Sequence, residues 1–135
     1  VGMLDLLEPG FGERILQEVR TIRHKAETMR GALIDPNTAT ITVVTIPEKA
    51  AVEESRRLIE TVEAHGVSVS TIVINHVMPD CDCRFCREKK SSQRSYIDEL
   101  SHSYKSKDLV ILPDYGGEVK GEGLMQVARD LYGRK

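Results

Sequence analysis

Three short runs of β-branched and aliphatic residues, separated by long amphipathic segments, constrain the fold of this chain most strongly. The runs cover residues 40–46, 67–77 and 109–113, and their Val, Ile and Thr content predicts three β-strands. A helical pattern follows each run, over residues 49–65, over 84–104, and in a last helix marked by Leu124, Val127, Ala128 and Leu131. This alternation specifies parallel strands with right-handed crossovers, so the chain is predicted to be an α/β protein.

A long helix is predicted before the first strand. Its apolar residues recur at intervals of four, three, four, three and four, at Ile15, Val19, Ile22, Ala26, Met29 and Leu33. The helix is expected to end at Asp35, because Pro36 disfavours helical backbone angles in the residue before it. Three strands are few for a parallel sheet, which is normally covered on both faces. The predicted fold is therefore a partial doubly wound parallel sheet, half of a larger domain.

Composition narrows the function classes. A chain of 135 residues is long enough for one domain, and a net charge of −2 argues against a nucleic-acid partner. No apolar run approaches the roughly 20 residues that a membrane span needs. Three clustered cysteines are not a disulfide framework, which predicts a reducing, cytoplasmic location. The first residue is Val1 rather than an initiator methionine, which suggests a fragment or a processed chain.

Asn75 stands at the end of the second predicted strand, where ligands bind in open α/β sheets. Its amide presents a donor and an acceptor in one plane and could pair with an adenine ring. The alternative is that Asn75 caps the turn that follows the strand. No Gly-x-x-x-x-Gly-Lys-Ser/Thr phosphate loop is found, and residues 116–121 lack its Lys-Ser/Thr ending. The residues predict a site that could hold a base without machinery for a triphosphate.

All the cysteines lie in the loop after Asn75, with Cys83 and Cys86 in Cys-x-x-Cys spacing. A structural zinc ion takes four ligands, so Cys83 and Cys86 need two more. Cys81 and His76 could supply them, or a second subunit could, which would make zinc a dimer clasp. The pair could instead be a redox dithiol, because the basic residues around it favour a reactive thiolate. Inert surface thiols are the third possibility.

Several stretches, in their order along the chain, resemble one known family. They are Asp35-Pro36, Ile46-Pro47-Glu48, Glu54-Ser55-Arg56-Arg57-Leu58, Ile72-Val73-Ile74-Asn75, Cys83-Arg84-Phe85-Cys86, Gln93-Arg94-Ser95-Tyr96-Ile97, and Leu112-Pro113 with Gly117-Glu118-Val119-Lys120-Gly121. Together they resemble the C-terminal part of the arsenical pump-driving ATPase and tail-anchored-protein targeting ATPase family. The resemblance runs from about Glu13 to Leu131.

The resemblance implies a deviant P-loop ATPase fold with a helical client-binding insertion. Residues 1–34 would be the end of that insertion, and residues 35–135 would be the C-terminal half of the ATPase domain. The complete protein would bind ATP or ADP with Mg, act as a homodimer joined through a shared zinc ion, and deliver tail-anchored membrane proteins by holding their hydrophobic transmembrane segments. It would be cytoplasmic and not membrane-integral.

The resemblance also assigns site residues. Cys83 and Cys86 would be the zinc ligands, and Glu48 would be a nucleotide contact near the subunit boundary. The adenine pocket would be lined by Asn75, Pro113, Asp114, Tyr115, Gly116, Gly117, Glu118, Val119 and Lys120.

The chain also departs from the family pattern. The P-loop and both switch segments are absent from this stretch, so the chain alone should not hydrolyse ATP and no catalytic residue is predicted in it. The Cys-x-x-Cys pair favours the targeting branch over the arsenite-pump branch. The competing function is a standalone zinc- or thiol-dependent binding module that uses an apolar patch of Met3, Leu4, Leu6 and Leu7.

Overall fold

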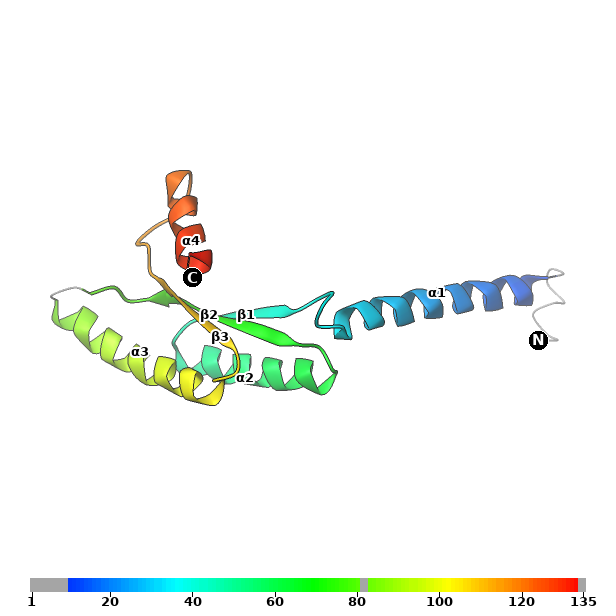
Figure 1. Cartoon of the computed structure of the whole chain (residues 1–135), viewed down its shortest axis with the longest axis horizontal. Coiled ribbons are helices and arrows are strands. Elements are labelled where there is room, and N and C mark those ends of the chain that lie inside the picture. Colours follow the sequence, from blue (N-terminus) through cyan, green and yellow to red (C-terminus); the bar gives the residue numbers. More distant parts are fainter. Residues whose placement is uncertain (1–9, 81–82, 134–135) are drawn as a thin grey trace. The chain divides into compact units, whose positions relative to one another are not determined.

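The computed structural model describes residues 10–80 and 83–133. Met3, Leu4, Leu6, Leu7 and Cys81, which the sequence analysis singled out, lie outside the described residues. The backbone forms two compact units, with the division between Ala39 and Thr40. The first unit holds helix α1 and the second holds the sheet with three further helices (Figure 1). None of the helices in the described ranges is both long and apolar enough to cross a membrane.

Helix α1 runs from Phe11 to Ile34 and ends where the sequence predicts. The Asp35 carboxylate accepts the Asn37 N–H and the Thr38 hydroxyl, both at 2.9 Å. These bonds lower the pKa of Asp35, chiefly through the Asn37 N–H, because they stabilise the charged form. Pro36 and this turn together stop the helix.

The predicted parallel sheet is confirmed. Strands β1 (Ile41–Thr45), β2 (Val69–Val77) and β3 (Asp108–Pro113) pair in the order β1-β2-β3. Both pairings are parallel, with Val43 beside Ile72 and Val73 beside Val110. β2 is therefore the central strand of the described sheet, and its apolar residues are buried on both faces.

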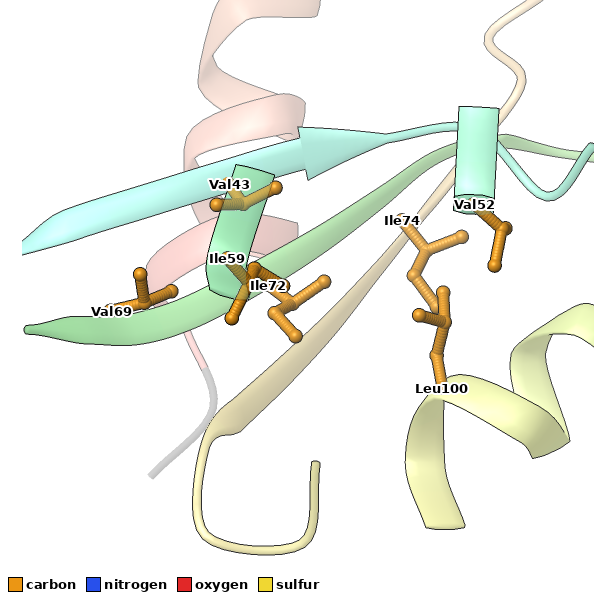
Figure 2. Close-up of a cluster of buried hydrophobic side chains, with 7 residues drawn as sticks. All are labelled: Val43, Val52, Ile59, Val69, Ile72, Ile74 and Leu100. Carbon is orange, nitrogen blue, oxygen red and sulfur yellow. The ribbon is translucent and has the colours of Figure 1, made fainter. Parts of the chain in front are cut away.

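Three helices flank the sheet: α2 (Lys49–Ala64), α3 (Arg84–Ser103) and α4 (Glu122–Tyr132). On one face, α2 and α3 contribute Val52, Ile59 and Leu100 to a core with four strand residues, Val43, Val69, Ile72 and Ile74 (Figure 2). On the other face, Val127 and Leu131 of α4 pack on Val73, Val110 and Leu112. Because neighbouring residues of β2 alternate between these two clusters, both faces carry helices, as in a doubly wound fold.

On the sheet face that carries α4, the part formed by β1 is not fully covered. Within the described residues β1 pairs only with β2, and the Val44 side chain on β1 is 62% exposed. A hollow of about 400 Å³ lies beside it and is lined by Val44, Thr45, Ile46, Ala51, Glu54, Ser55, Leu58 and Asn75. An apolar edge strand with an uncovered face is unusual in a parallel sheet, and it matches the prediction of a partial sheet.

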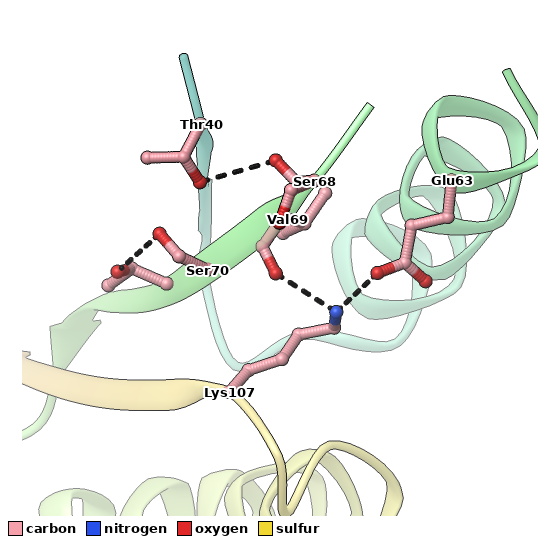
Figure 3. Close-up of polar contacts among 7 residues, drawn as sticks. Thr40, Glu63, Ser68, Val69, Ser70 and Lys107 are labelled. Carbon is pink, nitrogen blue, oxygen red and sulfur yellow. Dashed lines mark hydrogen bonds and ion pairs between the residues drawn. The ribbon is translucent and has the colours of Figure 1, made fainter. Parts of the chain in front are cut away.

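A polar contact ties the amino ends of the strands to α2. The Lys107 ammonium donates to the Val69 carbonyl oxygen at 3.0 Å and to the Glu63 carboxylate of α2 (Figure 3). Its side chain is only 11% exposed, whereas a surface lysine is normally solvated. Lys107 therefore joins the turn before β3 to both β2 and α2.

Replacing Lys107 by methionine should lower the free energy of unfolding by about 1–3 kcal/mol, because the Val69 carbonyl and the Glu63 carboxylate lose their donor while the buried stem is kept. Urea unfolding followed by circular dichroism measures the change. Lys105→Met is the matched control, since Lys105 is exposed two residues away. Equal losses in the two variants would show that the contact contributes no stability.

Candidate functional site

A hollow of about 320 Å³ opens at the carboxyl ends of β2 and β3, beside α4. It is lined by Asn75, His76, Leu112, Pro113, Asp114, Tyr115, Gly117, Val119, Leu124 and Val127. Its volume is at the lower end of the range of about 300–1,000 Å³ that is typical of small-molecule sites. The hollow thus lies where parallel α/β sheets bind ligands, and it unites residues from two strand ends and one helix.

Of the residues predicted for the adenine pocket, Asn75, Pro113, Asp114, Tyr115, Gly117 and Val119 share this hollow. Glu48, Gly116, Glu118 and Lys120 are not among its lining residues. Glu48 occupies the N-cap position of α2, and its carbonyl oxygen accepts the Val52 N–H at 2.9 Å. Glu118 and Lys120 pair with each other at 2.8 Å on the surface, where such pairs contribute little.

A β-bulge interrupts the pairing of β2 with β3 at Asn75 and His76. Between Ile74 and Val77, β2 advances three residues while β3 advances two, from Ile111 to Pro113. The extra residue places His76 at φ = 55°, in the left-handed region that non-glycine residues rarely occupy. Bulges re-aim neighbouring side chains and are common next to ligand sites. Asn75 is half-buried and comes two residues after Val73, so strand alternation places it on the α4 face, where it lines this hollow as well as the hollow beside Val44.

Gln93 of α3 fixes the chain just after the bulge. Its side chain is buried, its Oε1 accepts the Met78 N–H at 2.8 Å, and its Nε2 donates to the His76 carbonyl oxygen at 3.2 Å. One amide thus pairs with two backbone groups, one within the bulge and one just after the end of β2. Sequence reasoning missed this role, although Gln93 lies seven residues before Leu100 and therefore on the same inner face of α3.

Asp114 links the two strand ends. Its N–H donates to the Val77 carbonyl oxygen at 2.8 Å, and its carboxylate lies 3.7 Å from the His76 imidazole and accepts the Gly116 N–H at 2.9 Å. The Gly116 N–H is the main cause that lowers the pKa of Asp114, and the His76 contact lowers it further. Asp114 therefore stays ionised at neutral pH and holds the loop as a turn, with Gly116 at φ = 74°.

Tyr115 connects that loop to α4. Its hydroxyl donates to the Asp130 carboxylate at 2.8 Å, and the second oxygen of that carboxylate accepts from Gln126 at 3.0 Å. Burial, together with the bond to Asp130, raises the pKa of Tyr115 to about 12. Both causes act against the tyrosinate, which would lose solvation and be repelled by the carboxylate.

Tyr115 should therefore remain protonated at about pH 11, where an ordinary tyrosine with a pKa of about 10 is mostly ionised. Because the folded pKa is raised, the contribution of this group to stability is complete below about pH 10 and falls as the pH approaches 12. Ring-carbon NMR shifts of the tyrosines would follow the titration. Asp130→Asn should move the Tyr115 titration toward 10, and Asp108→Asn should leave it in place; an unchanged titration in Asp130→Asn would contradict this assignment.

The cysteine pair lies at the start of α3. Cys83 is the N-cap residue, and its Sγ accepts the Cys86 N–H at 3.1 Å. The two Sγ atoms are 2.6 Å apart, with Cys83 exposed and Cys86 partly so. Cys86 takes part in a disulfide bond in this structure, and Cys83 is not its partner in that bond. The spacing thus brings two sulfurs to one point on the surface, which suits either two metal ligands when reduced or dithiol chemistry.

His76 does not join this pair. Among the described residues, no cluster holds three or more His, Cys, Asp or Glu side chains that could bind a metal together. His76 instead contacts Asp114 in the hollow. A tetrahedral zinc shell built on Cys83 and Cys86 would therefore need ligands from outside the described part of the chain.

The chemistry of the hollow follows from its walls. Leu112, Val119, Leu124 and Val127 supply apolar surface, and the Asn75 amide supplies a donor and an acceptor in one plane. Apolar walls with few convergent polar groups suit a flat heteroaromatic base. Around the hollow, Glu118 carries charge of the wrong sign for a phosphate, and Lys120 is paired with it.

Several known proteins are similar to this chain in sequence. The sequence matches the profile of the anion-transporting ATPase family over residues 1–133. It is 31% identical over 126 residues to "ATPase ASNA1 homolog 2" of Paramecium tetraurelia, covering 87% of this chain and 39% of that protein. It is 28% identical over 116 residues to "ATPase get3" of Neurospora crassa, covering 78% of this chain and 34% of that protein.

In another relative, the similarity extends over nearly the whole of the present chain. "ATPase GET3" of Debaryomyces hansenii is 24% identical over 134 residues, which cover 96% of this chain and 38% of that protein. The chain thus spans between 34% and 39% of the length of these three relatives. Since the match to the family profile covers residues 1–133 of this chain, the chain belongs to the anion-transporting ATPase family.

Proposed function

We propose that this chain is part of an ATP-dependent targeting ATPase. It would bind the adenine base of the nucleotide and supply the cysteines for a zinc ion shared between two subunits. Its 320 Å³ hollow would hold the adenine base, with the Asn75 amide pairing to the ring edge and the apolar walls contacting its faces. The observation that carries this proposal is the convergence of Asn75 with Pro113, Tyr115 and Val119 from a separate strand end and loop. Shape and polarity both suit a base there.

The phosphates would be bound by another part of the protein. At the start of α4, beside the hollow, the Gly123 and Leu124 N–H groups already donate to the Lys120 and Gly121 carbonyl oxygens, and Glu122 in the first turn adds negative charge that disfavours a phosphate. The exposed face of Val44 and the outer edge of β1 are where further strands of a larger sheet would pack. On this proposal the 135 residues alone bind a base weakly and do not hydrolyse ATP.

Cys83 and Cys86 would be the zinc ligands when Cys86 is reduced. Once reduced, the two thiolates at the start of α3 could fill half of a tetrahedral shell, and the same pair from a second subunit would complete it. Zinc would then join two subunits in a homodimer. In the complete cytoplasmic protein, ATP or ADP with Mg would bind between the subunits, and their closure would alter a groove for the hydrophobic transmembrane segment of a client.

Adenosine titration followed by amide NMR tests the base site without needing the phosphate machinery. Shifts should concentrate at Asn75 and residues 113–119, with a dissociation constant on the order of millimolar, since a small fragment has few contacts. Guanosine, whose ring edge presents the opposite donor and acceptor order, should cause smaller shifts. Shifts scattered over the surface, or equal for both nucleosides, would count against the proposal.

Asn75→Asp is the matched variant, because it removes the amide donor without changing the side-chain shape. It should remove the preference for adenosine and leave the fold intact. Asn37→Asp, in the exposed turn after α1, is the control and should bind adenosine as the unmodified chain does.

A further inference from the structure

Asp114 places a carboxylate at the mouth of the hollow at the ends of β2 and β3. It directly follows β3 and comes two residues after Leu112, so strand alternation puts both side chains on the α4 face of the sheet. Leu112 is buried, whereas the Asp114 side chain is 36% exposed. A ligand whose flat part lies against Leu112 would therefore carry its outer part past Asp114.

The two carboxylate oxygens of Asp114 have different surroundings. Oδ1 accepts the Gly116 N–H at 2.9 Å, which fixes the orientation of the side chain. Oδ2 lies 3.7 Å from Nδ1 of His76, which is longer than the roughly 2.7–3.2 Å of an N–H···O hydrogen bond. Within residues 10–80 and 83–133, no donor lies within hydrogen-bond distance of Oδ2. This partly exposed oxygen can therefore accept a hydrogen bond from a ligand.

The backbone at the mouth keeps a strained conformation. His76 has φ = 55°, in the left-handed region. The Gln93 side chain donates to the His76 carbonyl oxygen, and the Asp114 N–H donates to the Val77 carbonyl oxygen. A strained residue persists only where the surrounding structure holds it firmly, and such residues concentrate at ligand sites. The bonds thus keep the His76 and Asp114 side chains at the mouth of the hollow.

The charge at the mouth indicates which part of a ligand fits there. The Gly116 N–H is the main cause that lowers the pKa of Asp114, and His76 and Lys89 lower it further. The carboxylate is therefore negative at neutral pH, so it repels a phosphate and attracts a neutral N–H or O–H donor. Ribose hydroxyls are such donors, and carboxylates bind them in dinucleotide-binding folds.

We propose that Oδ2 of Asp114 accepts a hydrogen bond from the 2′,3′-diol of a ribonucleoside whose base lies in the hollow. The hollow would then select ribonucleosides over nucleosides that lack these hydroxyls. This inference rests on the proposed function, because it needs the base in the hollow. Asp114 would be a specificity-determining residue, and the 5′ carbon of the ribose would point away from it, toward the part of the protein that binds the phosphates.

Titration of the intact 135-residue chain with adenosine and with 2′,3′-dideoxyadenosine, followed by amide NMR, tests the proposal. The two nucleosides carry the same base, and only adenosine has the two hydroxyls. Adenosine should bind on the order of fivefold more tightly, because the dideoxy compound loses a hydrogen bond to a charged acceptor at a partly exposed site. The Gly116 amide, which shares the Asp114 carboxylate, should shift more with adenosine than with the dideoxy compound.

Asp114→Asn is the matched variant, because it keeps the side-chain shape and one oxygen for the Gly116 N–H while it removes the second acceptor. It should bind the two nucleosides equally. Asp98→Asn is the control, since Asp98 lies 3.9 Å from Arg94 on α3 and does not line the hollow. It should keep the preference for adenosine. The comparison of the two nucleosides on the unmodified chain still tests the proposal if Asp114→Asn does not fold.

The outcomes distinguish this inference from the proposed function. Equal binding of the two nucleosides by the unmodified chain, with shifts at Asn75 and residues 113–119, would overturn the sugar contact and leave the base site standing. A preference for adenosine over the dideoxy compound that survives in Asp114→Asn would also overturn the sugar contact. If that variant lost instead the preference for adenosine over purine riboside, which lacks the amino group, Asp114 would contact the base. Shifts outside the hollow alone would overturn both the inference and the proposed function.

Discussion

Replacing Leu100 by alanine should lower the free energy of unfolding by about 3 kcal/mol. Leu100 is fully buried, and it joins α3 to Ile72 and Ile74 on the central strand (Figure 2). Its truncation removes apolar contacts and leaves a cavity that a sheet packed on α2 and α3 cannot easily close. Because a domain is stable by only about 5–15 kcal/mol, this is a large fraction of the total. Urea unfolding followed by circular dichroism measures it.

Leu58→Ala is the matched control for Leu100→Ala. Leu58 lies on α2 beside the hollow near Val44 and is 47% exposed, so its truncation should cost less than about 1 kcal/mol. If the two variants lose equal stability, the core is not where the structure places it.

Replacing Cys83 by serine should abolish zinc-linked dimers of the reduced chain. A complete structural zinc site is worth on the order of 10 kcal/mol, and removal of one ligand from each subunit leaves an open shell. The unmodified chain, reduced and loaded with zinc, should contain one zinc ion per two chains. Sedimentation with metal analysis measures both the mass and the stoichiometry.

The secondary structure of Cys83→Ser should be unchanged. Cys83 is exposed and caps α3 through its side chain, and serine is a better N-cap residue than cysteine. Cys81→Ser is the control, because it should leave the shared zinc in place. One zinc per single chain, lost in Cys81→Ser, would instead support a zinc site within one chain.

The strands and helices could be predicted because their signals are local. The run of Val and Ile in β2 and the periodic apolar residues of α2 each predict an element without knowledge of its neighbours. The structure has α1 at Phe11–Ile34, where the apolar pattern runs from Ile15 to Leu33, and β2 at Val69–Val77, where the predicted strand is 67–77. The parallel orientation of the strands could be predicted from the alternation of strands and helices alone.

Long-range polar contacts could not be predicted in the same way. The bulge at Asn75 and His76 depends on the register between β2 and β3, which no single segment encodes. The Gln93 and Lys107 contacts join residues 15 to 44 positions apart in the sequence. Polar residues in helices and turns are usually solvated, so nothing local marks these two as buried partners.

Only part of the candidate site could be predicted from the sequence. The rule that ligands bind at the carboxyl ends of parallel strands indicated Asn75 and the loop after Pro113, and the structure brings these together in one hollow. The apolar walls from Leu124 and Val127 were missed, because their helical spacing indicated only a core face. The roles of Glu48, Glu118 and Lys120 as nucleotide contacts stay predictions.

The central claim is that the hollow and the cysteine pair belong to a nucleotide-binding half-domain that needs further strands to bind phosphates. Calorimetric titration of ATP with Mg into the reduced 135-residue chain, with a phosphate-release assay on the same sample, tests it most directly. The account predicts affinity for ATP no better than on the order of millimolar, similar to that for adenosine, and no turnover. Micromolar binding with steady release of phosphate by these residues alone would contradict it.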